Sequence, residues 1–97
     1  MGLFCMEFQK EPGRIFALGE DGKLLAEITF PTGEDGVADI DHTFVDESLR
    51  GQGVASQLVR AAAEELRAQG KRAKTSCWYA AQWFEKHPQE QDLLYKE

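Results

Sequence analysis

An arginine and two glycines stand together at residues 50–53 (RGQG), directly before a run of small residues and leucines that predicts a helix. The first amides of a helix have no partner within it, and the helix dipole adds partial positive charge there. Gly51 and Gly53 lack the Cβ atom that would hold a ligand away from those amides, and Arg50 adds a cation. We therefore expect a phosphate group to bind here. A tight turn that only requires glycine is the alternative.

The turn does not fit the two common nucleotide-binding motifs. A P-loop requires Lys followed by Ser or Thr after the second of two widely spaced glycines, and the sequence has no such pair. A dinucleotide-binding motif has a third glycine where Ser56 stands, and an acidic residue about 20 positions further on, where the sequence is KRAKTSC. Both motifs are therefore excluded as the reason for the glycines.

Three side chains elsewhere could take part in proton or acyl transfer. Histidine titrates near neutral pH, so His42 could act as a general base, or it could simply be packed in the core. Cys77 could be a nucleophile, a proton donor or a small buried hydrophobic residue. Tyr79 is a second candidate proton donor, with a structural role as the alternative. The histidines and cysteines, at positions 5, 42, 77 and 87, lack the spacing of metal ligands, so no metal site is expected.

Alternating apolar residues and turn residues predict four consecutive antiparallel strands, at 4–9, 14–18, 24–30 and 37–45. In the last of these the alternation places Ala38, Ile40, His42 and Phe44 on one face. His42 near the end of this strand and Cys77 at the end of a later one could therefore face one cleft.

The period of the apolar residues changes after the glycine turn. Apolar residues three and four positions apart predict an amphipathic helix over 53–69, and KRAKTSC (71–77) predicts a short strand. A strand, a helix and a strand in this order predict a parallel pair with a right-handed crossover. A shorter helix over 79–87 should end before Pro88. The chain is thus expected to be one mixed α+β domain spanning residues 1–97.

The composition narrows the possible partners. The chain has 97 residues and a net charge of −6, which argues against nucleic-acid binding. The first 48 residues hold 3 Lys or Arg and 11 Asp or Glu, so an anionic ligand should favour the second half. The sequence has neither the apolar run of roughly 20 residues that a membrane span requires nor the pattern of a signal peptide. We expect a cytoplasmic protein with free cysteines and no membrane partner.

The segment from Arg50 to Ala55 (RGQGVA) resembles the R/Q-x-x-G-x-G/A signature of the GNAT superfamily of N-acetyltransferases. More closely, HTFVDESLRGQGVASQLV together with CWYAAQWFEKHP is similar to the small single-domain GNAT-like family of about 100 residues. The resemblance covers residues from about 24 to 94. It implies a GNAT-like fold, in which antiparallel strands lead into the signature helix and a parallel strand follows.

The resemblance also implies a cofactor and its binding residues. In that superfamily the amides of the signature hold the pyrophosphate of acetyl-coenzyme A (acetyl-CoA), and acetyl-pantetheine enters the gap between two diverging strands. A histidine and a cysteine at the positions of His42 and Cys77 are features of the small family. The coenzyme-binding residues implied here are Phe44, Val45, Arg50, Gly51, Gln52, Gly53, Val54, Ala55 and Ser56.

By this resemblance we expect an acetyl-CoA-dependent N-acetyltransferase. The acceptor would be an amine, for example a peptide lysine or N-terminus, with direct transfer in a ternary complex. Larger superfamily members usually have an amino-terminal helical pair that helps to build the acceptor pocket, whereas four strands are predicted before the signature here, so the acceptor site is expected to be open or borrowed. The alternatives are a non-catalytic coenzyme A-binding module that acts through a protein partner, and a structural domain without a ligand. The chain could be a monomer or have a protein partner.

Overall fold

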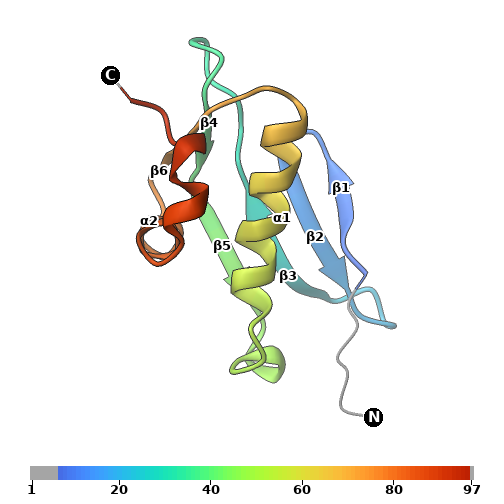
Figure 1. Ribbon diagram of the computed structural model, residues 1–97. Coiled ribbons are helices and arrows are strands. Elements are labelled where there is room, and N and C mark those ends of the chain that lie inside the picture. The colour runs from blue at the N-terminus through green and yellow to red at the C-terminus, as the bar shows by residue number, and fades with distance from the viewer. Residues whose placement is uncertain (1–6, 97) are drawn as a thin grey trace.

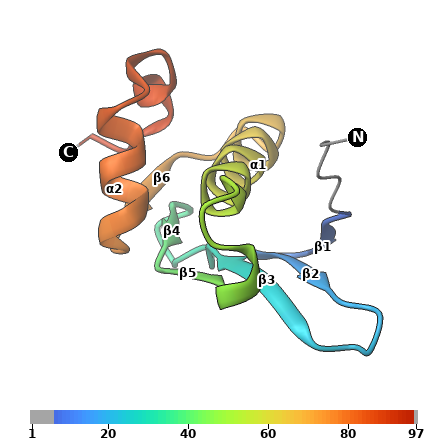
Figure 2. The same cartoon turned by 90° about the horizontal axis from the view of Figure 1, so that it is seen from below.

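The computed structural model describes residues 7–96 and shows a mixed α+β fold, as the sequence predicts (Figure 1). Figure 2 shows that both α-helices lie on the same face of the sheet. The elements in chain order are β1 (Gln9–Glu11), β2 (Arg14–Leu18), β3 (Leu24–Thr29), β4 (Ala38–Ile40), β5 (His42–Val45), the 3₁₀ turn η1 (Glu47–Leu49), α1 (Val54–Ala68), β6 (Ala73–Thr75), α2 (Trp78–Glu85) and the 3₁₀ turn η2 (Pro88–Leu93).

Four strands form an antiparallel sheet in the order β1-β2-β3-β5. The turn at Pro12 and Gly13 pairs Glu11 directly with Arg14, so the first strand lies closer to the turn than the predicted 4–9. Residues 4–6 of that prediction lie outside the described residues. The strands predicted at 14–18 and 24–30 are confirmed to within one residue.

The prediction of one strand over 37–45 is wrong, because the structure divides it into β4 and β5. β4 pairs in parallel with β6, whereas β5 pairs antiparallel with β3. The amide of Asp41, between the two strands, donates a hydrogen bond to the carbonyl of Thr29 at 3.2 Å. The amide of Cys77 donates to the carbonyl of Ile40 at 3.0 Å, just where the parallel pairing with β6 ends. β5 therefore diverges from the chain that follows β6.

The break also changes which residues share a face of the sheet. Thr43 lies opposite the buried Ile28, and Val45 lies opposite the buried Ala26. Directly opposite residues of an antiparallel pair project to the same face, so Thr43 and Val45 project toward the helices. The regular alternation predicted His42 and Phe44 on that face. An extra residue at a strand break reverses the alternation after it, as a β-bulge does.

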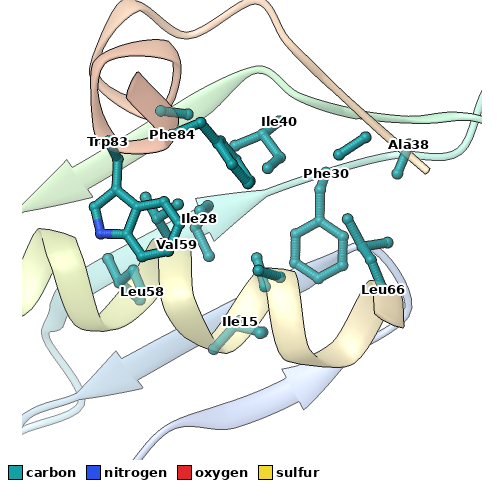
Figure 3. Close-up of a cluster of buried hydrophobic side chains, with 14 of the residues drawn as sticks. Ile15, Ile28, Phe30, Ala38, Ile40, Leu58, Val59, Leu66, Trp83 and Phe84 are labelled. Carbon is teal, nitrogen blue, oxygen red and sulfur yellow. The ribbon is translucent and has the colours of Figure 1, made fainter. Parts of the chain in front are cut away.

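Helix α1 supplies most of the core that covers the sheet. Its buried residues recur every three or four positions, which confirms the helix predicted over 53–69. Figure 3 shows Leu58, Val59 and Leu66 of this helix facing Ile15 and Ile28 of the sheet. Leu58 and Ile28 are fully buried. Burial of this apolar stripe fixes the direction of α1 and thereby the position of its amino end.

The C-terminal segments close the other side of the core. Trp83 and Phe84 of α2 are buried, and Phe84 lies beside Ile40 of β4 (Figure 3). The predicted helix is confirmed, and η2 begins at Pro88 as expected for a residue that cannot continue a helix. Within the described residues 7–96, every helix is too short or too polar to cross a bilayer.

Candidate functional site

A cavity of about 550 Å³ lies at the amino end of α1, bounded by β5 on one side and the start of α2 on the other. It joins the glycine turn to the carboxyl end of β6, segments far apart in the sequence. The lining residues are Thr43, Val45, Leu49, Arg50, Gly51, Gly53, Val54, Ala55, Ser56, Cys77, Trp78 and Tyr79.

The chain between β5 and the glycine turn is held by Asp46. Its amide donates to the carbonyl of Leu25 at 2.8 Å, which ties the end of β5 to β3. Its carboxylate accepts hydrogen bonds from the hydroxyl of Ser48 at 2.7 Å and from the amide of Ser48 at 3.1 Å, which caps η1. These bonds lower the pKa of the Asp46 carboxyl, and Lys23, 3.4 Å away, acts in the same direction.

Gly51 and Gly53 both have positive φ angles, of 82° and 77°. A Cβ atom added at either position would meet nothing within 4 Å, so open space lies in front of this backbone. Gly53 is the N-cap residue and has no side chain to cap α1. The first helical hydrogen bond runs from the amide of Gln57 to the carbonyl of Gly53, which leaves the amides of Val54 to Ser56 without helical partners. The turn therefore fits an oxyanion ligand such as a diphosphate.

Two side chains set the charge and shape of this end of the cavity. Arg50 is exposed and lines the cavity, so its guanidinium is free to move toward a bound anion. The hydroxyl of Ser56 accepts a hydrogen bond from Nε1 of Trp83 at 2.9 Å. This bond joins α1 to α2 beside the cavity and keeps the two helix starts in fixed relative positions.

Beside the start of α2 the sulfur of Cys77 lies 3.6 Å from Oγ1 of Thr43. Cys77 is a free thiol and is partly buried. Tyr79 is also partly buried, and burial raises the pKa of its hydroxyl. A tyrosine hydroxyl is protonated at neutral pH even without this shift, so Tyr79 offers an O–H group to the cavity. Trp78 is 73% exposed and forms the open edge of the cavity.

The structure does not bring every predicted residue to this cavity. His42 and Phe44 project from the opposite face of the sheet, because they pair with Thr29 and Glu27. There Nε2 of His42 lies 3.6 Å from Oε1 of Glu27. The expectation that His42 and Cys77 face one cleft is therefore not met.

Gln52 is also turned away from the cavity, because its side-chain amide donates to the carbonyl of Ser48 at 3.3 Å. Conversely, Thr43 and Leu49 line the cavity although they were not among the predicted binding residues. The apolar Leu49 gave no chemical signal, and Thr43 would have been found only if the break at Asp41 had been recognised. Trp78 also lines the cavity, and its side chain is exposed.

The sequence profile of the GCN5-related N-acetyltransferases matches residues 15–93, a segment that includes the glycine turn and Cys77. The chain therefore belongs to this family. The NATD1 protein of Bos taurus is 33% identical over 57 residues, which cover 59% of this chain. That match spans half the length of the bovine protein.

Two solved structures share the fold. A GCN5-like protein of Staphylococcus aureus aligns with a TM-score of 0.77 and 29% identity, over 95% of this chain and 90% of that one. A protein of Bacillus anthracis, whose structure contains acetyl-CoA, aligns with a TM-score of 0.57 and 20% identity, over 79% of this chain and 47% of that one. At that identity the second comparison shows the fold alone. Together they confirm the predicted GNAT-like fold.

Proposed function

We propose that this chain binds acetyl-CoA in the cavity at the amino end of α1 and transfers the acetyl group to an amine in a ternary complex. The observation that carries the proposal is the open turn at Gly51 and Gly53. The backbone of this turn has open space in front of it and lines one cavity together with Cys77 and Tyr79. The chain also belongs to the N-acetyltransferase family. A site for an anion and candidate groups for acyl transfer are thus combined.

The two ends of the cavity would hold different parts of the coenzyme. The free amides of the first turn of α1, together with Arg50, would bind the diphosphate. Val45 and Thr43 of β5 line the wall that leads toward Cys77, and they would hold the pantetheine arm. When bound, the coenzyme supplies an activated thioester. The residues of this chain orient it and provide protons.

Tyr79 and Cys77 are the candidate proton donors to the departing thiolate. The hydroxyl of Tyr79 carries a proton at neutral pH, as a donor requires, although burial raises its pKa and so makes it a weaker acid. Cys77 could serve as donor, or as a nucleophile that carries the acetyl group. We favour direct transfer because it requires no second acyl exchange at a partly buried sulfur.

The acceptor amine would approach on the face of the sheet where His42 lies and would reach the thioester through the opening where β5 diverges from the chain that follows β6. Asp41 is exposed next to it, and its carboxylate accepts a hydrogen bond from the hydroxyl of Thr29. Negative charge at this position favours a protonated amine over a neutral or anionic acceptor. His42, beside Glu27, would then take the proton that the amine must lose before attack.

A coenzyme A-binding module without catalysis is the second candidate. It is favoured by the separation of His42 from the cavity that contains Cys77.

Labelled acetyl-CoA separates the two candidates. Transfer of label to a lysine-containing peptide or to spermidine, slowed by His42→Ala and by Tyr79→Phe, would support the enzyme. Thermal stabilisation by coenzyme A should accompany it, because a ligand that binds only the native state adds about 2.7 kcal/mol at a hundredfold excess over Kd. Stabilisation without transfer to either acceptor would favour the binding module. Absence of stabilisation would overturn both.

A further inference from the structure

Cys77 and the glycine turn lie in one continuous cavity, and this placement has a consequence beyond acetyl transfer. We infer that Cys77 is a site of mixed-disulfide formation with coenzyme A, and that the cavity directs coenzyme A disulfide to it. The inference rests on the proposed coenzyme site. It adds a covalent, reversible modification that would block that site.

The position of the sulfur supports this inference. The amide of Cys77 is fixed by the carbonyl of Ile40, and its sulfur is in contact with the hydroxyl of Thr43 at 3.6 Å. Neither contact closes off the thiol, which lines the cavity and keeps partial exposure. The thiol therefore opens onto the same cavity as the diphosphate turn, and a coenzyme A arm that runs from the turn along β5 would bring its sulfur toward Cys77.

The turn supplies an independent reason for selectivity. Open space in front of Gly51 and Gly53, together with the charge of Arg50, favours a disulfide that carries a diphosphate over one that does not. Binding converts the exchange into a reaction within one complex, at an effective concentration that can reach the millimolar range. A disulfide without the diphosphate reacts only by random collision.

The exposed edge of the cavity makes room for the leaving group. Coenzyme A disulfide has two identical halves, and only one can occupy the turn. The second half would extend past Trp78, which is 73% exposed. An enclosed cavity would exclude the disulfide, whereas this one is open next to Cys77.

The exchange step balances without an additional oxidant. The thiolate of Cys77 attacks the sulfur of the half held by the turn, and a new sulfur–sulfur bond forms. The original bond of coenzyme A disulfide breaks, and the outer half leaves as the coenzyme A thiolate. Coenzyme A disulfide supplies the oxidising equivalents. The tethered coenzyme A then occupies the cavity until a thiol reductant removes it.

The test compares two disulfides on the full chain by mass spectrometry. Coenzyme A disulfide is compared with pantethine, which has the same sulfur-bearing arm but no diphosphate or nucleotide. We expect coenzyme A disulfide to modify Cys77 at least about tenfold faster at equal concentration, with a rate that saturates. Arg50→Gln should lower that rate and leave the pantethine rate unchanged. Cys77→Ser should remove the adduct that coenzyme A disulfide forms in the cavity.

The same rate with both disulfides, or an adduct that forms in Cys77→Ser at the wild-type rate, would overturn the inference. A second measurement, the thermal stabilisation of Cys77→Ser by reduced coenzyme A, separates failure of this inference from failure of the proposed function. If reduced coenzyme A stabilises the variant but labelling of the wild-type chain is unselective, the coenzyme site stands and the disulfide does not. If reduced coenzyme A fails to stabilise either chain, the coenzyme site and the inference fail together.

Discussion

The two ends of helix α1 contrast in how their polar groups are satisfied. At the carboxyl end, Arg67 donates hydrogen bonds to Asp92 and Glu90, and Arg72 donates to the carbonyl of Asp92. At the amino end, the N-cap residue is Gly53 and the first amides lack helical partners. One end is thus tied to the C-terminal segment, and the other is left open toward a cavity.

A cavity of similar volume, about 570 Å³, lies at the carboxyl end, yet its polar lining differs. Lys10 there pairs with Glu65 at 3.5 Å, and Lys71 donates to the hydroxyl of Thr32 at 2.8 Å. These cations already have partners, whereas Arg50 lines its cavity beside bare backbone. Volume alone therefore does not distinguish a ligand site. The two cavities differ instead in whether their polar groups still have free hydrogen-bonding capacity.

The largest effect is expected from the middle of the helix, which serves both ends. Leu58 is fully buried, so Leu58→Ala should lower the free energy of unfolding by about 2–5 kcal/mol. Urea denaturation of the two chains measures this. Both ends should unfold in one transition, because the same apolar stripe positions them. Two separate transitions would show that the ends are energetically independent.

A substitution at the open end should act on binding. Gly53→Val adds a branched side chain at a φ of 77° and fills the space in front of the turn, so we expect coenzyme A affinity to fall on the order of a hundredfold. Isothermal titration calorimetry measures the affinity. Gly22→Val is the matched control, because Gly22 has a φ of 84° and equally open surroundings in the β2–β3 turn. Equal losses in both variants would indicate general strain rather than a lost site.

The charge at the open end should contribute less than its shape. Arg50→Gln removes the cation and keeps a polar side chain, so coenzyme A should bind about tenfold more weakly. The loss should shrink in high salt, because Arg50 is exposed and its interactions are screened. Titrations at two salt concentrations measure both effects. Unchanged affinity at low salt would show that the backbone alone holds the diphosphate.

The corresponding change at the tied end should leave binding unaffected. Arg67→Gln breaks the ion pairs with Asp92 and Glu90, which are exposed and therefore contribute little to stability. We expect the melting temperature to fall slightly. The coenzyme A affinity should equal that of the wild-type chain. A loss of affinity as large as that in Arg50→Gln would mean that the two ends are coupled through the helix.

Much of this contrast could be predicted from the sequence. The apolar period identified α1 to within one residue at each end, because burial of one stripe dominates the energetics of an amphipathic helix. The residues RGQG identified the open turn, since glycine before a helix and a nearby arginine have direct chemical meaning. The tied end could not be predicted, because the partners of Arg67 lie more than 20 positions away in the sequence.

The lining of the cavity was predicted only in part, and the reason is the break at Asp41. A single residue outside the alternation moves Thr43 and Val45 onto the cavity side and His42 and Phe44 away from it. The sequence VADIDHTFV alternates without interruption, so no local signal reveals the break. It arises because β4 and β5 pair with different strands, which is a property of the whole fold.

The smallest effect concerns acid pH and the aspartate that precedes the open turn. Hydrogen bonds from Ser48 lower the pKa of Asp46, so its carboxylate stabilises the fold above the unfolded-state pKa of about 3.9. That stabilisation is lost as pH falls through the lower pKa of the folded state. Asp46→Asn should therefore melt at a lower temperature than the wild-type chain at pH 6, and the gap should close toward pH 3.

Asp92 provides the matched comparison at the tied end, because Arg67 lowers the pKa of its carboxyl as well. Asp92→Asn should show the same closing gap in melting temperature between pH 6 and pH 3. At neutral pH, however, only Asp46→Asn should weaken coenzyme A binding, since Asp46 caps the 3₁₀ turn that leads into Gly51. Weaker binding in Asp92→Asn would contradict the assignment of the two ends, because it would mean that the contacts between α1 and the C-terminal segment shape the coenzyme turn.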